Sequence, residues 1–154
     1  MRRRALPLAL FSAIALVAAG LALAASHALI LPTHTPGVRY SAVTQKTLFK
    51  TVCRVGWKAT IRPPASYTSA LKRRQLLLFQ YVDKTSTHYE EDHLVSLELG
   101  GAPRSTRNLW PEPWSQARSD DNGIEARLHR RLCLGTLTLR QAQAAEIAYK
   151  HKSG

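Results

Sequence analysis

Residues 89–114 read YEEDHLVSLELGGAPRSTRNLWPEPW, and this stretch decides the fold that the sequence predicts. Asp92 and His93 stand at the head of a short apolar run in which alternate residues would face one side of a strand. A Gly100-Gly101 turn follows, and Asn108 opens a second short apolar run that two prolines end. The pattern predicts a β-hairpin that holds an acid and a histidine at fixed positions.

The rest of the chain predicts helices around this hairpin. The expected elements are a strand or short helix over 47–55, a strand over 57–61, a helix over 68–81, hairpin strands over 93–99 and 108–110, and helices over 121–134 and 138–150. Gly135 is placed to end one helix as its C′ residue, and Thr138 with Gln141 forms a capping box for the last. We therefore expect an α+β fold with the hairpin embedded among helices.

The first 28 residues have the pattern of an export signal. Three arginines precede an uncharged apolar stretch over 6–25, and small residues offer cleavage sites after Ala24 or Ala28. An uncleaved inner-membrane anchor over 6–25 is the alternative, since about 20 apolar residues can span a bilayer. Residues 29–43 read as a flexible leader and 44–154 as one small domain, so we expect a secreted or periplasmic protein.

The chain is strongly basic, with 22 Lys and Arg against 10 Asp and Glu and a net charge of +12. Loss of the signal would remove three arginines and leave a charge of +9. A small exported domain this basic suits a polyanionic partner such as nucleic acid. A basic surface that only keeps the protein soluble, or that is attracted to an anionic envelope, is the alternative.

Two cysteines, Cys53 and Cys133, lie far apart in the chain. Outside the cytoplasm an even pair indicates a disulfide, which would tie the start of the domain to its late helix. Two buried free thiols are the alternative. Neither cysteine belongs to a CxxC pair, which argues against a zinc site.

The hairpin motif resembles the ββα-metal hairpin of HNH endonucleases, whose core reads DH, a short strand, GG, and NL at a set distance. The segments 53–64 (CRVGWKATIRPP) and 125–143 resemble small exported bacterial members of that family, so the resemblance covers roughly residues 44–149. The sequence departs from the family at Ser96, where Pro is usual. It departs again at residues 119–121, where Ser-Asp-Asp replaces an expected Lys-Asp.

The resemblance implies a metal-dependent endonuclease. His93 would be the general base, because a neutral imidazole can take the proton of water at pH 7, and Asn108 would brace the loop that orients it. Asp92 would hold the metal on the opposite side of the strand, with Asp121 as a second ligand. An oxygen-rich shell favours Mg²⁺ or Mn²⁺. An ordinary turn histidine and turn asparagine are the alternatives.

Four basic residues would contact the nucleic acid. Arg104 and Arg107 lie in the hairpin loop, where arginine can bind phosphate with two parallel hydrogen bonds, and Lys72 and Arg73 lie on the helix over 68–81. A solvated surface is the alternative for each. We expect an exported endonuclease that hydrolyses DNA, with RNA as a further substrate. The alternative is an envelope-associated nucleic-acid-binding module whose nuclease site has decayed.

Overall fold

The computed structural model describes residues 35–121 and 123–153. The expected signal or anchor over 1–28, and residues 29–34 of the expected leader, lie outside the described residues. In chain order the elements, with η for a short 3-10 helix, are η1 (Leu48–Lys50), α1 (Trp57–Ile61), α2 (Ala65–Leu78), η2 (Ser86–His88), β1 (Tyr89–His93), η3 (Leu97–Leu99), β2 (Leu109–Pro113), α3 (Trp114–Asp121), α4 (Ile124–Cys133) and α5 (Leu139–Ser153). Helices around one small sheet confirm the α+β class. None of the helices in this part of the chain has the length and hydropathy needed to cross a bilayer.

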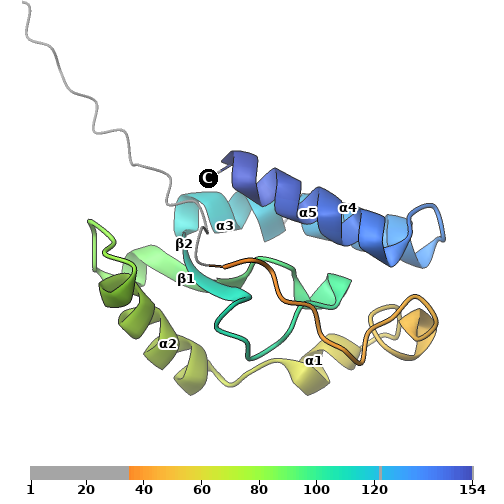
Figure 1. Ribbon diagram of the computed structural model, residues 1–154, viewed down its shortest axis with the longest axis horizontal. Helices are drawn as coiled ribbons and strands as arrows, with labels where there is room; N and C mark the ends of the chain where they lie inside the picture. The colour runs from red at the N-terminus through yellow and green to blue at the C-terminus, as the bar shows by residue number, and fades with distance from the viewer. Residues whose placement is uncertain (1–34, 122, 154) are drawn as a thin grey trace, which may run out of the picture.

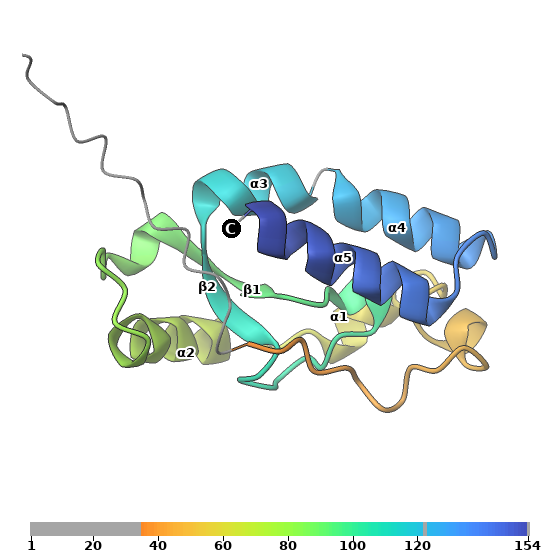
Figure 2. The same cartoon turned by 45° about the horizontal axis from the view of Figure 1, so that its top comes forward.

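The sheet consists of β1 and β2, which pair antiparallel, and it lies between α2 on one side and α3 to α5 on the other (Figures 1 and 2). His93 pairs with Leu109, and Tyr89 pairs with Pro113. The first strand therefore ends at His93, whereas the sequence predicted that it begins there and runs over 93–99. That prediction was wrong because both Leu94 and Val95 are fully buried, so the run turns into the core instead of alternating between core and solvent.

The second strand is longer than the predicted 108–110, and it contains the two prolines that were expected to end it. In a two-stranded sheet the outer edge of β2 needs no ladder partner, so a proline whose nitrogen faces that edge loses no hydrogen bond. Side chains from the α2 region bind the outward carbonyls there. Gln75 Nε2 donates to Leu109 O at 2.9 Å, and Tyr81 Oη donates to Pro111 O at 2.8 Å.

One further prediction about local structure was wrong, and two predicted helices exist with different first residues. Residues 57–61 form α1 and not a strand, and α1 ends before Pro63 because the residue that precedes a proline disfavours helical geometry. The helix expected over 121–134 exists as α4, which begins at Ile124, and it is preceded by α3, which ends at Asp121 and was not predicted. The helix expected over 68–81 exists as α2 but begins earlier, directly after Pro64.

The signals at the last turn of α4 and the first turn of α5 are confirmed. Gly135 follows α4 with φ of 74°, a left-handed conformation that suits glycine. Thr138 N donates to Gln141 Oε1 at 2.9 Å and Gln141 N donates to Thr138 Oγ1 at 3.3 Å, which is the reciprocal pattern of a capping box. α4 and α5 thereby form an antiparallel pair that covers one side of the domain (Figure 2).

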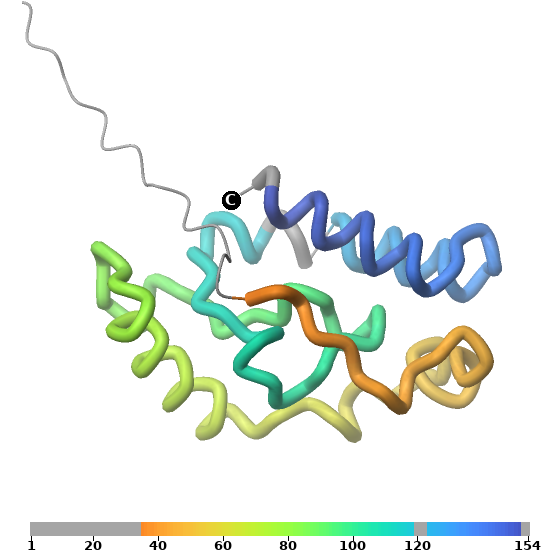
Figure 3. Tube along the Cα trace, in the orientation of Figure 1, coloured from red at the N-terminus to blue at the C-terminus, as the bar shows by residue number. Residues whose placement is uncertain are grey.

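Residues 35–43 belong to the folded domain, although the sequence placed them in a flexible leader. Val43 is buried in the core, Arg39 forms a β-bridge with Gly101, and Tyr40 N donates to Gly100 O at 2.8 Å. Figure 3 shows this segment running along the loop between the two strands. The main core joins it to the inner faces of α4 and α5 through buried Val43, Leu48, Val52, Val95, Leu99, Ile124, Leu128, Leu132, Leu139 and Ala142.

The predicted disulfide between Cys53 and Cys133 is present, with the two Cα atoms 5.6 Å apart. It joins the segment before α1 to the end of α4 across a sequence separation of 80 residues. His129 Nε2 lies 3.4 Å from Cys133 Sγ and 2.9 Å from Val52 O. The side chains of Cys53, His129 and Cys133 form a group that could hold a metal ion, but the two sulfurs are bonded to each other and are not thiolates.

Candidate functional site

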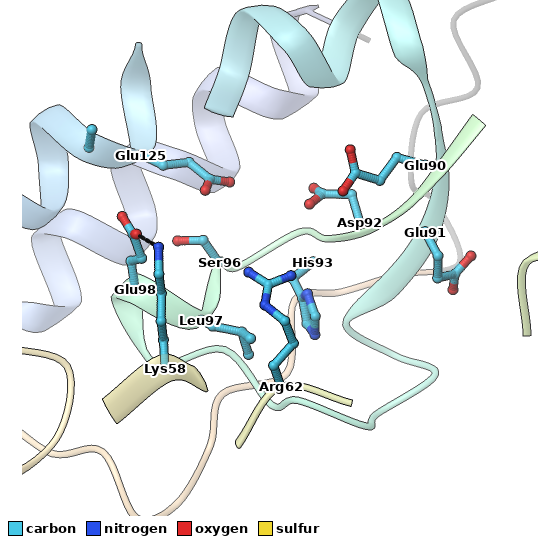
Figure 4. A pocket seen from close by; sticks show the side chains of 11 residues that line it. Lys58, Arg62, Glu90, Glu91, Asp92, His93, Ser96, Leu97, Glu98 and Glu125 are labelled. Atoms are coloured by element: carbon cyan, nitrogen blue, oxygen red, sulfur yellow. Dashed lines mark hydrogen bonds and ion pairs between the residues drawn. The ribbon is translucent and has the colours of Figure 1, made fainter. Parts of the chain in front are cut away.

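β1 places four acidic and imidazole side chains on alternate sides of one strand. Figure 4 shows Glu90 and Asp92 pointing to one side and Glu91 and His93 to the other, as the two-residue period of a strand requires. Two adjoining clefts open here, of about 310 Å³ and about 390 Å³. The residues that line both of them are Arg62, Glu90, Glu91 and His93. The first cleft is also lined by Lys58, and the second by Lys72.

His93 has a fixed orientation in this site. Its side chain is largely buried, and its Nε2 lies 3.0 Å from Pro103 O. Because a carbonyl oxygen only accepts hydrogen bonds, Nε2 carries the proton and Nδ1 is the proton acceptor of the neutral ring. Burial lowers the pKa of His93 below its ordinary value, although the Asp92 carboxylate acts in the opposite direction. At pH 7 the imidazole is therefore neutral.

Asn108 braces the loop that holds His93 but does not line either cleft. Its side chain is fully buried, and its amide binds both backbone groups of Val95, with Oδ1 accepting from N and Nδ2 donating to O, each at 3.0 Å. Nδ2 also donates to Ala102 O at 3.2 Å, directly before the carbonyl of Pro103 that holds His93. Asn108 is thus placed to act on His93 through the loop backbone.

The two loop glycines serve different purposes. Gly100 has φ of 79°, as the turn signal in the sequence predicted. Gly101 has no such constraint, but a Cβ there would lie 1.7 Å from Val95 O, so the loop backbone can close only around a residue without a side chain. Because Gly101 packs closely against Val95, the Asn108 amide can bind both Val95 and Ala102.

Asp92 does not present its carboxylate to a free metal position. Lys150 Nζ, from α5, lies 2.6 Å from Asp92 Oδ2 and 2.9 Å from Glu125 Oε1. Burial would raise the pKa of Asp92, but Lys150, His93 and Glu112 together lower it below its ordinary value, so the carboxylate is ionised. The donor set therefore does not fit the expected Mg²⁺ or Mn²⁺, because an ammonium already occupies the space beside the first ligand.

The second expected ligand, Asp121, is the last residue of α3 and not the first of a helix. Its side chain lies outside the part of the structure that is described. Glu125, four residues before His129 on α4, reaches Lys150, whereas His129 reaches the disulfide. The two do not share a metal site.

Glu91 is a site residue that the sequence did not single out. It is 9% exposed, and neither carboxylate oxygen has a hydrogen-bond partner within the described residues. Burial raises the pKa of Glu91 to about 8, although Lys72 acts to lower it. A buried acid beside a neutral histidine, in a cleft with basic walls, is an arrangement typical of functional sites.

The basic side chains divide into two groups. Lys72 lines the second cleft and its Nζ donates to Tyr89 O at 2.6 Å, while Arg73 on the same helix is exposed away from both clefts. Arg104 lies over the ring of Tyr67 at 5.8 Å, and it and Arg107 are exposed in the loop, outside the cleft walls.

Arg62 and Lys58 are the cleft cations that the sequence did not predict as site residues. Figure 4 shows the Arg62 guanidinium beside His93, and Lys58 forms an ion pair with Glu98 at the rim. Lys58 lies in α1 and Arg62 directly follows it, and because this segment was expected to be a strand, their place in the cleft could not be foreseen.

No protein-family model matches the chain, and no curated protein or solved structure does either. The resemblance to HNH endonucleases therefore rests on the sequence motifs within residues 44–149 and stays a prediction.

Proposed function

We propose that the chain is a nuclease that hydrolyses phosphodiester bonds of nucleic acid, with His93 as its general base. The observation that carries this proposal is the imidazole itself, which is neutral, held through Nε2 by Pro103 O, and part of the lining of a cleft with cationic walls. A general base needs a fixed position and a pKa that leaves it unprotonated at working pH. His93 meets both conditions.

The reaction that suits this geometry is attack by water on phosphorus. The new P–O bond forms as Nδ1 of His93 takes one proton of the water, and the P–O bond opposite to it breaks. The sugar oxygen leaves with the electron pair of that bond and takes a proton from solvent. Negative charge grows on the phosphate oxygens at that point, and preorganised cations stabilise it. Arg62 lies beside His93 and lines both clefts, and Lys72 lines the second (Figure 4).

The substrate class follows from charge. A net charge of +12 on 154 residues attracts a polyanion and speeds its association. The resemblance favours DNA, with RNA as a further substrate, and the export signal expected over 1–28 would place the activity outside the cytoplasm. The divalent cation that the resemblance implies does not fit the donor set beside Asp92, so no step is assigned to it.

The second candidate is a nucleic-acid-binding module that does not cleave. The Lys150 ammonium favours it, because it lies where the HNH pattern places a metal and would leave the site without that cofactor. The same basic clefts would then bind the phosphate backbone without hydrolysing it.

The test is cleavage of supercoiled plasmid, single-stranded DNA and RNA by the purified chain and by His93→Ala. We expect the variant to lose about 10² to 10⁴ in rate while binding DNA as before, since a general base contributes that much. The matched control is His88→Ala, which removes an exposed histidine just before β1 that pairs with Asp83. Equal cleavage by wild type and His93→Ala would remove His93 from the mechanism. Binding without cleavage of any of the three substrates would establish the second candidate.

A further inference from the structure

Lys150 is a buried lysine with every hydrogen-bond donor in use. Its side chain is fully inaccessible to solvent, and Nζ lies 2.6 Å from Asp92 Oδ2, 2.9 Å from Glu125 Oε1 and 3.0 Å from His93 O. An ammonium has three N–H groups, so these three oxygens satisfy it completely. The oxygens come from β1 and α4, and the lysine from α5.

The surroundings of Lys150 are acidic on every side. Burial would lower its pKa, but Asp92, Glu125, Glu146 and Glu112 raise it well above the ordinary value. Glu112 and Glu146 are themselves fully buried, on β2 and α5. Within the described residues, the Lys150 ammonium therefore lies among four carboxyl groups, and each of them raises its pKa.

This shell is chemically that of a hard metal ion. Carboxylate and backbone carbonyl oxygens are the ligands that Mg²⁺, Mn²⁺ and Ca²⁺ take in proteins, at about 2.0 to 2.6 Å. A metal ion bound to Asp92 Oδ2 at such a distance would overlap the position of Nζ and be repelled by its charge. Lysine and metal are therefore mutually exclusive on that oxygen.

We propose that Lys150 is the resident cation of this carboxylate cluster and holds the place that the HNH resemblance gives to a divalent metal ion. Its ammonium joins Asp92 to Glu125 and, through His93 O, fixes the backbone of the residue proposed as base. Only one consequence of this inference rests on the proposed function: cleavage by the wild-type protein should need no divalent cation.

A Mn²⁺ titration, in which electron paramagnetic resonance measures the free ion, tests the inference without reference to activity. We expect wild type to bind no Mn²⁺ at this cluster. Lys150→Met removes the charge with little loss of volume, and we expect it to bind one Mn²⁺ at concentrations at which wild type binds none. Adding Asp92→Asn should abolish that gain. Lys50→Met, at the exposed end of η1, is the matched control and should behave as wild type.

The Lys150→Met chain risks unfolding, because breaking a buried ion pair leaves the remaining carboxylates buried without their partner. In that case Mn²⁺ should restore the fold of this variant, as monitored by circular dichroism, and should have no such effect after the added Asp92→Asn. Wild type that binds Mn²⁺ through Asp92 as tightly as the variant overturns the inference.

Cleavage by wild type in excess chelator is the second readout. We expect the rate in EDTA to equal the rate with added Mg²⁺ or Mn²⁺, and a rate that vanishes in EDTA and returns with metal overturns the inference. If wild type cleaves nothing under any condition, the proposed function fails, and the Mn²⁺ titration alone still decides the place of Lys150.

Discussion

Replacing Glu91 by glutamine should remove a large part of the pH dependence of stability. Burial raises the pKa of this carboxyl from 4.5 to about 8. Between those two values the unfolded chain has released a proton that the folded protein keeps, so stability falls as pH rises through the window. Each pKa unit corresponds to about 1.4 kcal/mol, and the whole difference therefore amounts to about 5 kcal/mol lost by pH 8.

The assay is urea denaturation of wild type and Glu91→Gln at several pH values from 4.5 to 8. We expect similar stability at the acidic end, where the carboxyl is neutral in both states, and a variant that is more stable by about 3 to 5 kcal/mol at the alkaline end. Some pH dependence should remain in the variant, because burial also raises the pKa of Glu146 to about 8. The control is Glu98→Gln, which alters a rim carboxylate paired with Lys58. Parallel pH profiles for wild type and Glu91→Gln would refute the reasoning.

Two further predictions concern the frame of the site. Replacing both Cys53 and Cys133 by alanine opens a loop of 80 residues, and we expect this to lower the free energy of unfolding by about 4 to 5 kcal/mol. Urea denaturation of the variant and of the oxidised wild type measures the difference. A loss below about 1 kcal/mol would contradict the chain-entropy argument. Asn108→Ala leaves a buried N–H and two buried carbonyls without partners. We therefore expect the free energy of unfolding to fall by about 3 kcal/mol or more and backbone hydrogen exchange at Val95 to become faster. Unchanged exchange at Val95 would show that the loop does not depend on this amide.

Signals that act over a few residues were readable in the sequence. Gly135 and the Thr138–Gln141 pair determine their helix ends through neighbouring backbone groups, and no distant contact overrides them. The disulfide followed from the number of cysteines and the expected compartment, which needed no geometry. The α+β class followed from the same local patterns.

The positions of the strands could not be read in this way, because hydrogen bonds from a side chain take the place of those from a neighbouring strand. Alternation over 93–99 suggested a strand, but the amide of Asn108 takes up both backbone groups of Val95 and lets the chain leave the sheet after His93. Residues 57–61 have strand-forming side chains but no neighbouring strand with which to pair, and they form α1 instead. Both errors arose from contacts across the fold.

The candidate site was predictable only in part for the same reason. Asp92 and His93 are adjacent and stand in a motif, so the sequence could single them out. Lys150 lies in a run of polar helix residues, and nothing local distinguishes it from a solvated lysine. In the sequence Glu91 could not be distinguished from Glu90, and only the fold shows that Glu91 is buried.

The disulfide also divides the chain topologically. Every residue that lines the two clefts lies between Cys53 and Cys133, so the bridge closes a covalent ring that contains both cleft walls. Lys150 is contributed from the segment beyond that ring, on a helix joined to it by a single connection after Gly135. A chain cut between α4 and α5 would therefore keep all its cleft residues in one covalent unit while its buried cation depended on non-covalent contacts alone.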